Sequence, residues 1–437
     1  MAEISAFCGL RYNPTLVKKI EKVVCPPYDV ISPEQQNKLH ASSRDNFIRL
    51  ILGKAKQSDT SRHNKYTRAG DFLKEAIRKK VFVCDSLPAI YLYEQEYRVA
   101  AQGYKRLGFI ALLRLEPTGK GVVFPHEKTF CKPKQDRLSL LKATQANLCP
   151  IFGLYDADDA AVDARLRKHA KAKPLYDFFF EGIRNKLWKI EDREFIRGLT
   201  QAMADKQIFI ADGHHRYEVA SLYHRLARKR TVARSRSDYV MMYFCNLRNQ
   251  GLRVLPTHRV VRNVSQEIIS QLPALLENYF KLSPCANLPE LLLQLKKRAG
   301  RRAFGLFLGA NRFYLLDVRA TPAKKKPVVS QGDYCYNNLD VVLLHSLVFS
   351  KLLKLKKQHH HDADIVYARD EKQAVSLVKS KKYQAAFFMN PPSPREISSI
   401  ARCFKKMPHK STYFYPKPVS GLVINMLKKE LPVESRE

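Results

Sequence analysis

The segment IFIADGHHRYEVA, residues 208–220, places an acid, a glycine, two histidines and an arginine in a row, from Asp212 to Arg216. Side chains of these types can bind anions and move protons. The three β-favouring residues IFI predict a buried strand, and the helical spacing of apolar residues after Arg216 predicts a helix. Because the first turn of a helix has free N–H groups and the positive end of the helix dipole, this pattern predicts an anion site where the strand meets the helix.

The same five residues also fit an ordinary turn. Asp-Gly is common turn chemistry, and Asp212 is well suited to cap the helix N-terminus. Adjacent histidines such as His214 and His215 also occur as solvated loop residues. The segment alone leaves both interpretations open, so the other polar stretches of the chain have to distinguish them.

Two polar stretches lie upstream. In CPPYDVIS, two prolines restrict the backbone ahead of Tyr28 and Asp29 and hold these side chains rigidly. In FPHEKTF, His126 and Glu127 are adjacent, and a general base needs a carboxylate in such a fixed polar setting. A stiff turn and a solvated loop are the respective alternatives.

Two more polar stretches lie downstream. PTHRVV puts His258 and Arg259 next to a strand. MPHKSTYFYPKPVSGL combines Lys410, Ser411 and Thr412 with aromatic residues and a further lysine, a composition suited to binding phosphate or lining a pocket wall. The alternative for this last stretch is a C-terminal strand that packs on the core.

Length and composition limit the class of protein. The chain has 437 residues, of which 45% are hydrophobic, so it can bury a sizeable core and is expected to form two or three domains. No apolar stretch is long enough to span a bilayer, and the first residues lack the pattern of a secretory signal. The nine cysteines include no Cys-x-x-Cys pair, which suggests neither a disulfide framework nor a zinc site. We therefore expect a soluble cytoplasmic protein.

The charge is strongly positive, since 77 Lys and Arg against 41 Asp and Glu give a formal net charge of +36. Such an excess is typical of nucleic-acid binders but also suits a protein that handles small anions. The basic residues cluster at 165–173, 225–236, 296–302 and 351–361, mostly near the ends of predicted helices. Solvated helix faces and ends explain most of them, and a nucleic-acid surface remains the alternative.

Strand-like and helix-like segments are mixed along the chain without a fixed repeat. The patterns predict strands within 89–116 and 238–247, amphipathic helices at 265–280, 287–300 and 338–355, and a hairpin over 303–318 that turns at Ala310-Asn311. This mixture predicts an α+β protein.

Taken together, these stretches resemble a bacterial family catalogued as a domain of unknown function, number 1015. The resemblance is carried by CPPYDVIS, NFIRLILG, PHEKTF with DRLSLLKATQANLCPIFGLY, ADGHHRYEVA, LPTHRVV and MPHKSTYFYPKPVSGL, in this order. This resemblance covers nearly the whole chain, and six motifs in the same order make the family assignment specific. The family has no settled activity, so this resemblance implies a family and no function.

A second, more distant resemblance concerns chemistry. His126-Glu127 and the turn from Asp212 to Arg216 are similar to the core motifs of the free serine kinases built on the ParB/sulfiredoxin-type fold. This resemblance implies that Glu127 is the base and that the turn binds the phosphates of ADP or ATP. The segment between the two motifs is longer here than in those compact kinases, with an inserted region around 155–205.

The resemblance and the residue chemistry together assign roles. The expected catalytic residues are Glu127, His126 and His215. The expected nucleotide- and phosphate-binding residues are Asp212, Gly213, His214, His215, Arg216, Arg259, Lys410 and Ser411. The expected substrate-binding residues are Tyr28, Asp29, His258 and Thr412. Mg²⁺ is the expected metal, with Asp212 as its candidate ligand.

We therefore predict an α+β protein with a ParB/sulfiredoxin-like core over 101–250. An N-terminal α/β region (1–100) and a C-terminal α/β region (251–437) that contributes pocket residues flank it. The expected activity is nucleotide-dependent phosphotransfer to a small hydroxy amino acid, reversible with phosphoserine. A ParB-like protein associated with nucleic acid and a phosphoserine hydrolase using the same anion site are the alternatives.

Overall fold

The computed structural model describes residues 2–116, 121–127, 129–157, 161–228, 235–319, 334–337, 339–355, 364–403, 405–408 and 410–428. These residues form two compact units. Unit 1 comprises Met1–Pro125, Thr129–Arg253 and Pro416–Glu437, and unit 2 comprises His126–Lys128 and Val254–Tyr415. Helices and sheets are mixed in both units, which confirms the predicted α+β class.

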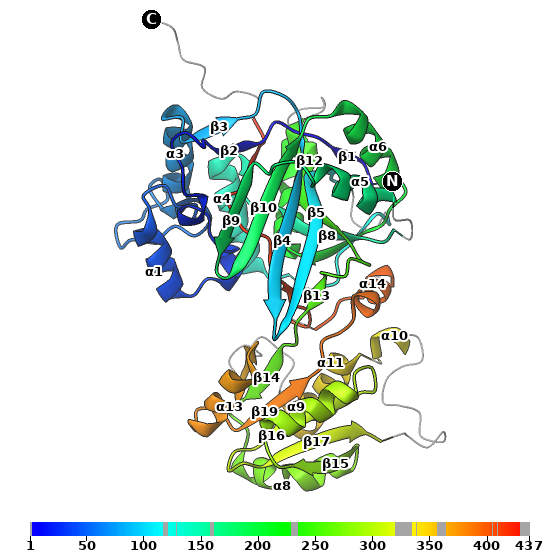
Figure 1. Cartoon of the computed structure of the whole chain (residues 1–437). Helices are drawn as coiled ribbons and strands as arrows, with labels where there is room; N and C mark the ends of the chain where they lie inside the picture. Colours follow the sequence, from blue (N-terminus) through cyan, green and yellow to red (C-terminus); the bar gives the residue numbers. More distant parts are fainter. Residues whose placement is uncertain are drawn as a thin grey trace, which may run out of the picture. The chain divides into compact units, whose positions relative to one another are not determined.

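A nine-stranded sheet forms the centre of unit 1 (Figure 1). Its strands follow the order β6-β11-β8-β12-β5-β4-β10-β9, and β1 pairs with β5 outside this path. The β11–β6 and β12–β8 pairs are parallel, and the other pairs are antiparallel. The strands are β1 (Ile4–Ser5), β4 (Ile90–Val99), β5 (Gln102–Arg114), β6 (Val123–Phe124), β8 (Ile151–Tyr155), β9 (Tyr176–Phe180), β10 (Ile183–Ile190), β11 (Ile208–Asp212) and β12 (Tyr239–Asn246).

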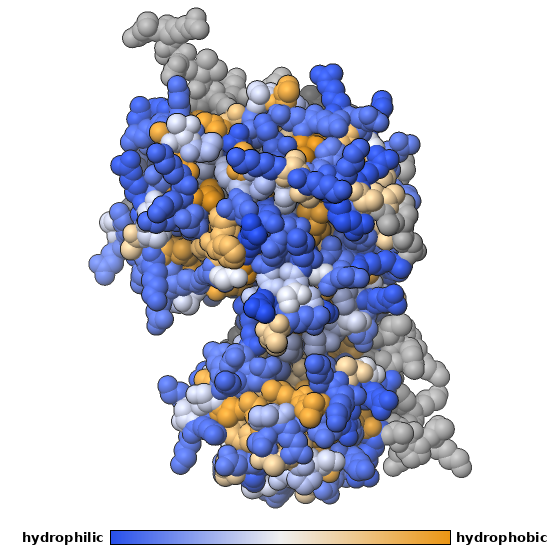
Figure 2. All heavy atoms as spheres, viewed as in Figure 1, coloured by the Kyte–Doolittle hydropathy of each residue, from blue (hydrophilic) through white to orange (hydrophobic). Residues whose placement is uncertain are grey.

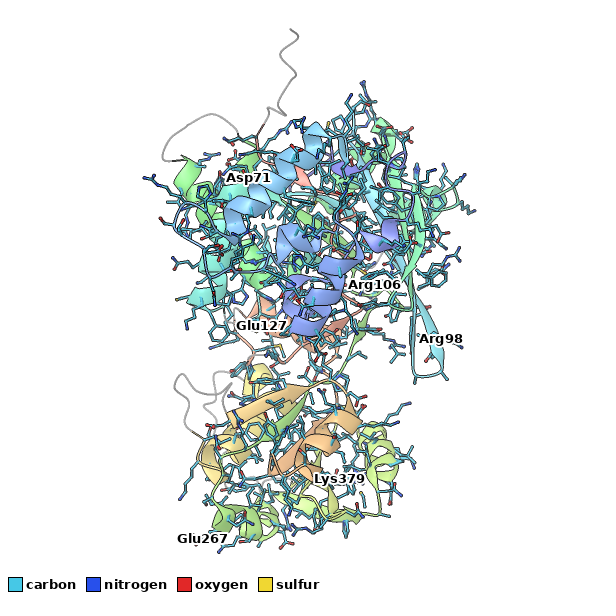
Figure 3. All side chains as sticks on the ribbon, turned by 90° about the vertical axis from the view of Figure 1, so that its left-hand side faces the viewer. Asp71, Arg98, Arg106, Glu127, Glu267 and Lys379 are labelled. Carbon is cyan, nitrogen blue, oxygen red and sulfur yellow. The ribbon has the colours of Figure 1, made fainter. Side chains whose placement is uncertain are left out.

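The long β4–β5 hairpin confirms the strands predicted within 89–116. Ile90 and Leu92 alternate with Tyr91 and Tyr93 along β4, and all four side chains are fully buried. Both faces of this strand are therefore covered, which explains an apolar run without hydrophobic–polar alternation. Arg98 lies near the projecting tip of the hairpin (Figure 3).

Helices α5, α6 and α7 cover one face of this sheet. Leu166 of α5, Leu199 of α6 and Tyr217 of α7 join one buried cluster with the strand residues Leu92 and Ile210. The helices of unit 1 are α1 (Pro33–Ser42), α2 (Ile48–Ile51), α3 (Lys65–Arg78), α4 (Cys131–Thr144), α5 (Ala161–His169), α6 (Arg193–Met203) and α7 (His214–Arg228), with the 3₁₀ helices η1 (Ile20–Lys22), η2 (Tyr28–Val30) and η3 (Arg236–Asp238). The predicted strand-to-helix junction at Asp212 is therefore confirmed, since β11 leads directly into α7.

The C-terminal segment 416–428 packs on unit 1 and bonds to the sheet. The Gln95 side-chain amide donates to the carbonyl of Lys417 at 3.3 Å, and Arg106 donates to the carbonyl of Pro416. Two small sheets complete the unit, β21 (Asn425–Met426) with β7 (Ala146–Asn147) and β2 (Leu10–Tyr12) with β3 (Phe82–Cys84). The final residues of the described chain are thus an integral part of unit 1.

Unit 2 contains a six-stranded antiparallel sheet in the order β15-β17-β16-β19-β14-β18. Its strands are β14 (His258–Val261), β15 (Phe280–Cys285), β16 (Ala303–Phe307), β17 (Phe313–Val318), β18 (Ile365–Ala368) and β19 (Ala385–Met389), and β13 (Arg253–Val254) pairs separately with β20 (Phe414–Tyr415). The predicted hairpin is confirmed, because β16 and β17 turn at Ala310 and Asn311, whose φ angles are 46° and 56°.

Helices cover both faces of the unit 2 sheet. Leu291 of α9 and Ala374 of α13 are buried with Val260 and Phe388, and Phe349 of η5 packs on Phe387 with ring centroids 5.3 Å apart. The helices are α8 (Gln266–Glu277), α9 (Leu288–Lys297), α10 (Tyr334–Asn337), α11 (Asp340–Leu343), the π-helix η5 (Leu344–Leu352), α13 (Glu371–Lys379) and α14 (Pro394–Arg402). The three helices predicted in this region are confirmed, the last of them with π-helical geometry in its second part.

The surface is mainly hydrophilic. Figure 2 shows charged and polar side chains over most of the visible face of unit 1 and a more apolar area on that of unit 2. The predicted basic clusters at 225–236 and 351–361 lie partly outside the described residues. Among the described helices, none has the length and hydropathy that crossing a membrane requires.

Gly108 on β5 provides a test of the unit 1 sheet. A Cβ at this position would lie 2.2 Å from the carbonyl oxygen of Phe244 and 2.7 Å from the ring of Tyr243, whereas a Cβ at Gly103 on the same strand meets nothing within 4 Å. We expect Gly108→Ala to lower the free energy of unfolding by about 2 kcal/mol through overpacking. Gly103→Ala is the matched control and should change it little. Urea unfolding followed by fluorescence measures both, and equal stabilities of the two variants would contradict this packing.

Candidate functional site

Lys417 links two acidic residues that are remote in sequence. Its ammonium group contacts the Oδ2 atom of Asp29 in η2 and the Oδ1 atom of Asp212 at the end of β11. The other carboxylate oxygen of Asp212 accepts from the Nη2 atom of Arg216 at 2.5 Å. We call these four residues the Asp212 cluster. Two cations and two carboxylates therefore form one continuous ionic network in unit 1.

Burial and charge act in opposite directions on the cations of this cluster. Only 8% of the Lys417 side chain is exposed. Burial alone would lower the pKa of Lys417, but the carboxylates of Asp212 and Asp29 outweigh it and raise the pKa. The pKa of Arg216 is also raised, because Asp212 outweighs the effect of burial. Both cations thus stay charged throughout the physiological pH range.

Gly213 forms the turn between β11 and α7. Its φ angle is +93°, and a Cβ there would lie 3.0 Å from the guanidinium of Arg216. The carbonyl of Gly213 accepts the first helical hydrogen bond from the N–H of Tyr217 at 3.0 Å. The N–H groups of the preceding residues therefore belong to the first turn of α7, where an anion is favoured.

The two histidines of the turn differ in environment. His214 is buried with 3% exposure. The Nε2 atom of His215 accepts a hydrogen bond from the N–H of Phe130 at 3.0 Å, so its ring is neutral and the proton sits on Nδ1. Burial is the main cause that lowers the pKa of His215, against the opposing effect of Glu218.

Glu218 of α7 binds Thr129, which precedes α4, and Lys134 in the first turn of α4. Its Oε2 atom accepts from the hydroxyl of Thr129 at 2.7 Å and lies 3.2 Å from the ammonium of Lys134. Together with the bond to His215, these contacts hold residues 129–134 against the first turns of α7.

Tyr28 packs beside the Asp212 cluster. The guanidinium of Arg137 lies 4.0 Å from the centroid of its ring. Arg137 also donates to the carbonyl of Ile51 at 2.9 Å and to the carboxylate of Asp136. Tyr28 and Asp29, predicted as substrate-binding residues, are thus held by two different cations, Arg137 and Lys417.

In unit 2, the His-Glu motif contacts the 407–412 segment. The Oε1 atom of Glu127 accepts from the backbone N–H of Lys410 at 3.1 Å, and the Nε2 atom of His126 lies 3.1 Å from the hydroxyl oxygen of Thr412. The carbonyl of His126 accepts from the N–H of Met407 at 2.7 Å. Lys410 has a φ of 52°, a left-handed conformation that is unusual for a residue with a side chain.

Arg259 is a buried residue that also contacts the 407–412 segment. It is 1% exposed and donates to the carbonyls of Thr257 and, at 3.3 Å, Lys410, while its guanidinium lies 5.6 Å from the ring centroid of Tyr367. Burial lowers its pKa to about 10, so it remains charged at neutral pH. No described acidic residue forms an ion pair with Arg259.

The polar side-chain atoms of His258 and Ser411 contact neighbouring residues of unit 2. His258 is 1% exposed, its Nδ1 accepts from the N–H of Met389 at 3.4 Å, and its Nε2 lies 3.6 Å from Glu371. Ser411 is 4% exposed, and its hydroxyl donates to the carbonyl of Pro408 at 2.5 Å. Both residues thus already have partners within unit 2.

The predicted site residues therefore gather in two groups. Unit 1 brings together Tyr28, Asp29, Asp212, Gly213 and Arg216, and unit 2 brings together His126, Glu127, Arg259, Lys410 and Thr412. Sequence reasoning included Lys417 in the 407–422 stretch suited to phosphate binding or a pocket wall but gave it no individual role, and it gave no role to Arg137. A signal for Lys417 was present, because it stands between two prolines in the same C-terminal motif.

The donor set does not fit a metal ion held by the protein at Asp212. Mg²⁺ usually binds one or two carboxylates together with substrate phosphates. Both carboxylate oxygens of Asp212 already contact cations, Lys417 and Arg216. Within the described ranges, no group of three or more His, Cys, Asp or Glu side chains is arranged to hold a metal.

Comparisons with solved structures give distant similarities. A free serine kinase variant in complex with AMP matches at 10% identity and a TM-score of 0.34, over 67% of this chain and 83% of that chain. A conserved hypothetical protein from Pyrococcus furiosus matches at 11% identity and a TM-score of 0.34, over 70% and 92%. SbnI with a C-terminal truncation, from Staphylococcus aureus, matches at 12% identity and a TM-score of 0.35, over 73% and 90%.

The family comparison is more extensive. No match was found among curated proteins. The family model described as "Protein of unknown function (DUF1015)" matches residues 4–342, which is most of the chain. The resemblance carried by the six ordered motifs is thereby confirmed, and the chain belongs to the DUF1015 family of proteins of unknown function.

Proposed function

We propose that this protein is a nucleotide-dependent phosphotransferase that acts on a small hydroxy amino acid, with ADP or ATP as the nucleotide. The observation that supports this most is the Asp212 cluster at the start of α7. The cluster contains two buried cations held by carboxylates. It lies beside the turn at Gly213 and the first N–H groups of the 15-residue helix α7. This combination suits the phosphates of a nucleotide.

Phosphoryl transfer needs positioning and charge neutralisation more than covalent help from the protein. In the proposed mechanism, the backbone N–H groups of the turn and the side chain of Arg216 bind phosphate oxygens. His214 and His215 complete the phosphate site, and Lys417 supplies a second positive charge. Because the side chains of Arg216, His215 and Lys417 are held by other contacts before the nucleotide binds, they need little reorganisation during transfer.

Glu127 is the proposed general base. A base of this kind accepts the proton of the substrate hydroxyl as the oxygen attacks the terminal phosphoryl group. The hydrogen bond from the N–H of Lys410 orients its carboxylate. His126, tied to Thr412, orients the motif from the preceding position.

The remaining assignments follow from charge and hydrogen-bonding capacity. We propose that Arg259, Lys410 and Ser411 contribute to anion binding and that Tyr28, Asp29, His258 and Thr412 contribute to recognition of the amino acid. We also retain the proposal of a ParB/sulfiredoxin-like core over 101–250, with flanking regions at 1–100 and 251–437. No step of the mechanism passes through a metal ion, since the donors at Asp212 do not fit one.

The first test is direct turnover. Purified protein is incubated with serine and ATP, and with phosphoserine in the presence and absence of ADP. Glu127→Gln is expected to lower turnover about 10²- to 10⁴-fold with little change in nucleotide affinity, because it removes only the base. His215→Ala is expected to weaken nucleotide binding.

Glu267→Gln is the matched control, because Glu267 is exposed at the start of α8 (Figure 3). Full turnover by both Glu127→Gln and His215→Ala would refute the site assignment. Phosphate release from phosphoserine without ADP would replace the transferase with a hydrolase.

Lys417 provides a second test. Lys417→Met leaves Asp29 and Asp212 without their shared cation, so we expect a loss of about 3 kcal/mol in unfolding free energy. ADP affinity should fall about tenfold or more, because a charged donor is lost. Calorimetric titration and urea unfolding measure the two effects. Lys18→Met, at an exposed position, is the control, and unchanged ADP affinity in Lys417→Met would exclude a phosphate role for this residue.

The lowered pKa of His215 predicts that the stability of the fold depends on pH. Its pKa in the folded protein lies below the value of 6.5 expected in the unfolded chain. Between these two values the unfolded chain binds more protons, so the contribution of His215 makes stability fall as the pH decreases through this window. His215→Gln lacks this contribution and should lose less stability between about pH 7.5 and about pH 5.5. Identical pH dependence of the urea midpoint in both proteins would show that folding does not lower the pKa of His215.

A further inference from the structure

A cavity of about 60 Å³ lies inside unit 1, next to Arg216. Tyr28, Arg137 and Arg216 line it, and most of the other lining residues are aliphatic side chains from α4, α7 and the strands beside them. The cavity is partly open to solvent. The wall of the cavity is therefore mainly apolar, and it includes two guanidinium groups and one phenol.

The charges that line this cavity are of one sign. Two guanidinium groups border it, and no carboxylate belongs to its lining. Asp136 is the acidic partner of Arg137, but it also binds the ammonium of Lys65 at 2.7 Å, so two cations share its charge. Arg216 pairs with Asp212, and Lys417 contacts both Asp212 and Asp29. Four cations therefore stand against three carboxylates around the cavity, and the excess positive charge favours an anion.

Hydrogen-bond donors are available at the same place. Arg216, Arg137 and Tyr28, whose side chains carry N–H or O–H donors, all line the cavity. Burial raises the pKa of Tyr28, so its hydroxyl keeps its proton and can donate as well.

The volume restricts what can enter. One water molecule requires roughly 10–15 Å³ of such volume, so the enclosed part of the cavity has room for about four to six water-sized groups. A single phosphate or carboxylate group has the appropriate size.

We propose that this cavity binds one phosphate group, with the guanidinium groups of Arg216 and Arg137 and the hydroxyl of Tyr28 as donors. The identification of the anion as phosphate rests on the proposed function. The presence of an anion site rests only on the cavity, its two arginines and the excess positive charge around it. Arg137 thereby becomes a ligand-binding residue that none of the sequence motifs assigned.

Inorganic phosphate is the probe for this site. Titration of the full chain by isothermal calorimetry at constant ionic strength should show one saturable phosphate per chain. Tyr28→Phe keeps the ring against Arg137 and removes one donor, so we expect affinity to fall about three- to tenfold. Arg137→Met should lower it at least about tenfold, because a charged donor is lost.

Arg78→Met is the control for non-specific binding to this basic protein, because Arg78 pairs with Glu75 on the exposed surface of α3. It should leave phosphate affinity unchanged. Melting temperatures of all variants identify any loss of folding, and Tyr28→Phe keeps the test valid if Arg137→Met unfolds. Unchanged phosphate affinity in folded Tyr28→Phe and Arg137→Met would overturn the assignment, as would the absence of saturable binding.

A competition with acetate and the serine kinase assay separate this proposal from the proposed function. Displacement of phosphate by acetate at equal concentration would overturn the assignment to phosphate. Phosphate binding that depends on Tyr28 and Arg137 without any transfer to serine would support the cavity and refute the kinase. Transfer to serine, together with phosphate binding that is insensitive to both substitutions, would support the kinase and refute the cavity.

Discussion

The ammonium of Lys417 between Asp29 and Asp212 is the interaction on which the arrangement of unit 1 depends most. It joins an N-terminal 3₁₀ turn, the junction between β11 and α7, and the C-terminal segment. Each carboxylate compensates part of the cost of burying the lysine, and Arg216 completes the charge balance. A buried charge of this kind is tolerated only with its partners in place, so the three segments are fixed relative to one another.

The position of Lys417 in the C-terminal segment is determined by hydrogen bonds between the sheet of unit 1 and the backbone of this segment. Gln95 and Arg106 of the β4–β5 hairpin bond to the two carbonyls at Pro416 and Lys417. These side chains are buried, so their hydrogen bonds are made in a medium where loss of a partner is costly. The chain leaves unit 1 after Arg253 and returns at Pro416, and the first residues after the return therefore complete the ionic network.

The buried cations of the two units have different kinds of partner. Lys417 and Arg216 are neutralised by carboxylates, and their pKa values are raised. Arg259 has only carbonyl oxygens, a methionine sulfur and an aromatic ring around it, and burial lowers its pKa. An anion that approaches Arg259 would find a charge still uncompensated, whereas an anion at Arg216 has to share that arginine with Asp212.

The sequence by itself determined the local structure: the strand before Asp212, the helix after it, the turn at Ala310-Asn311 and the mixed α+β class. These features depend on residue periodicity and turn chemistry within a few positions, which a single sequence displays. Only the tertiary structure decided that Lys417 meets Asp29 and Asp212, that His258 and Arg259 are interior, and that Arg137 borders a cavity. The physical reason is that burial and ion pairing between residues hundreds of positions apart follow from the packing of whole segments, and no local pattern encodes which segments become neighbours.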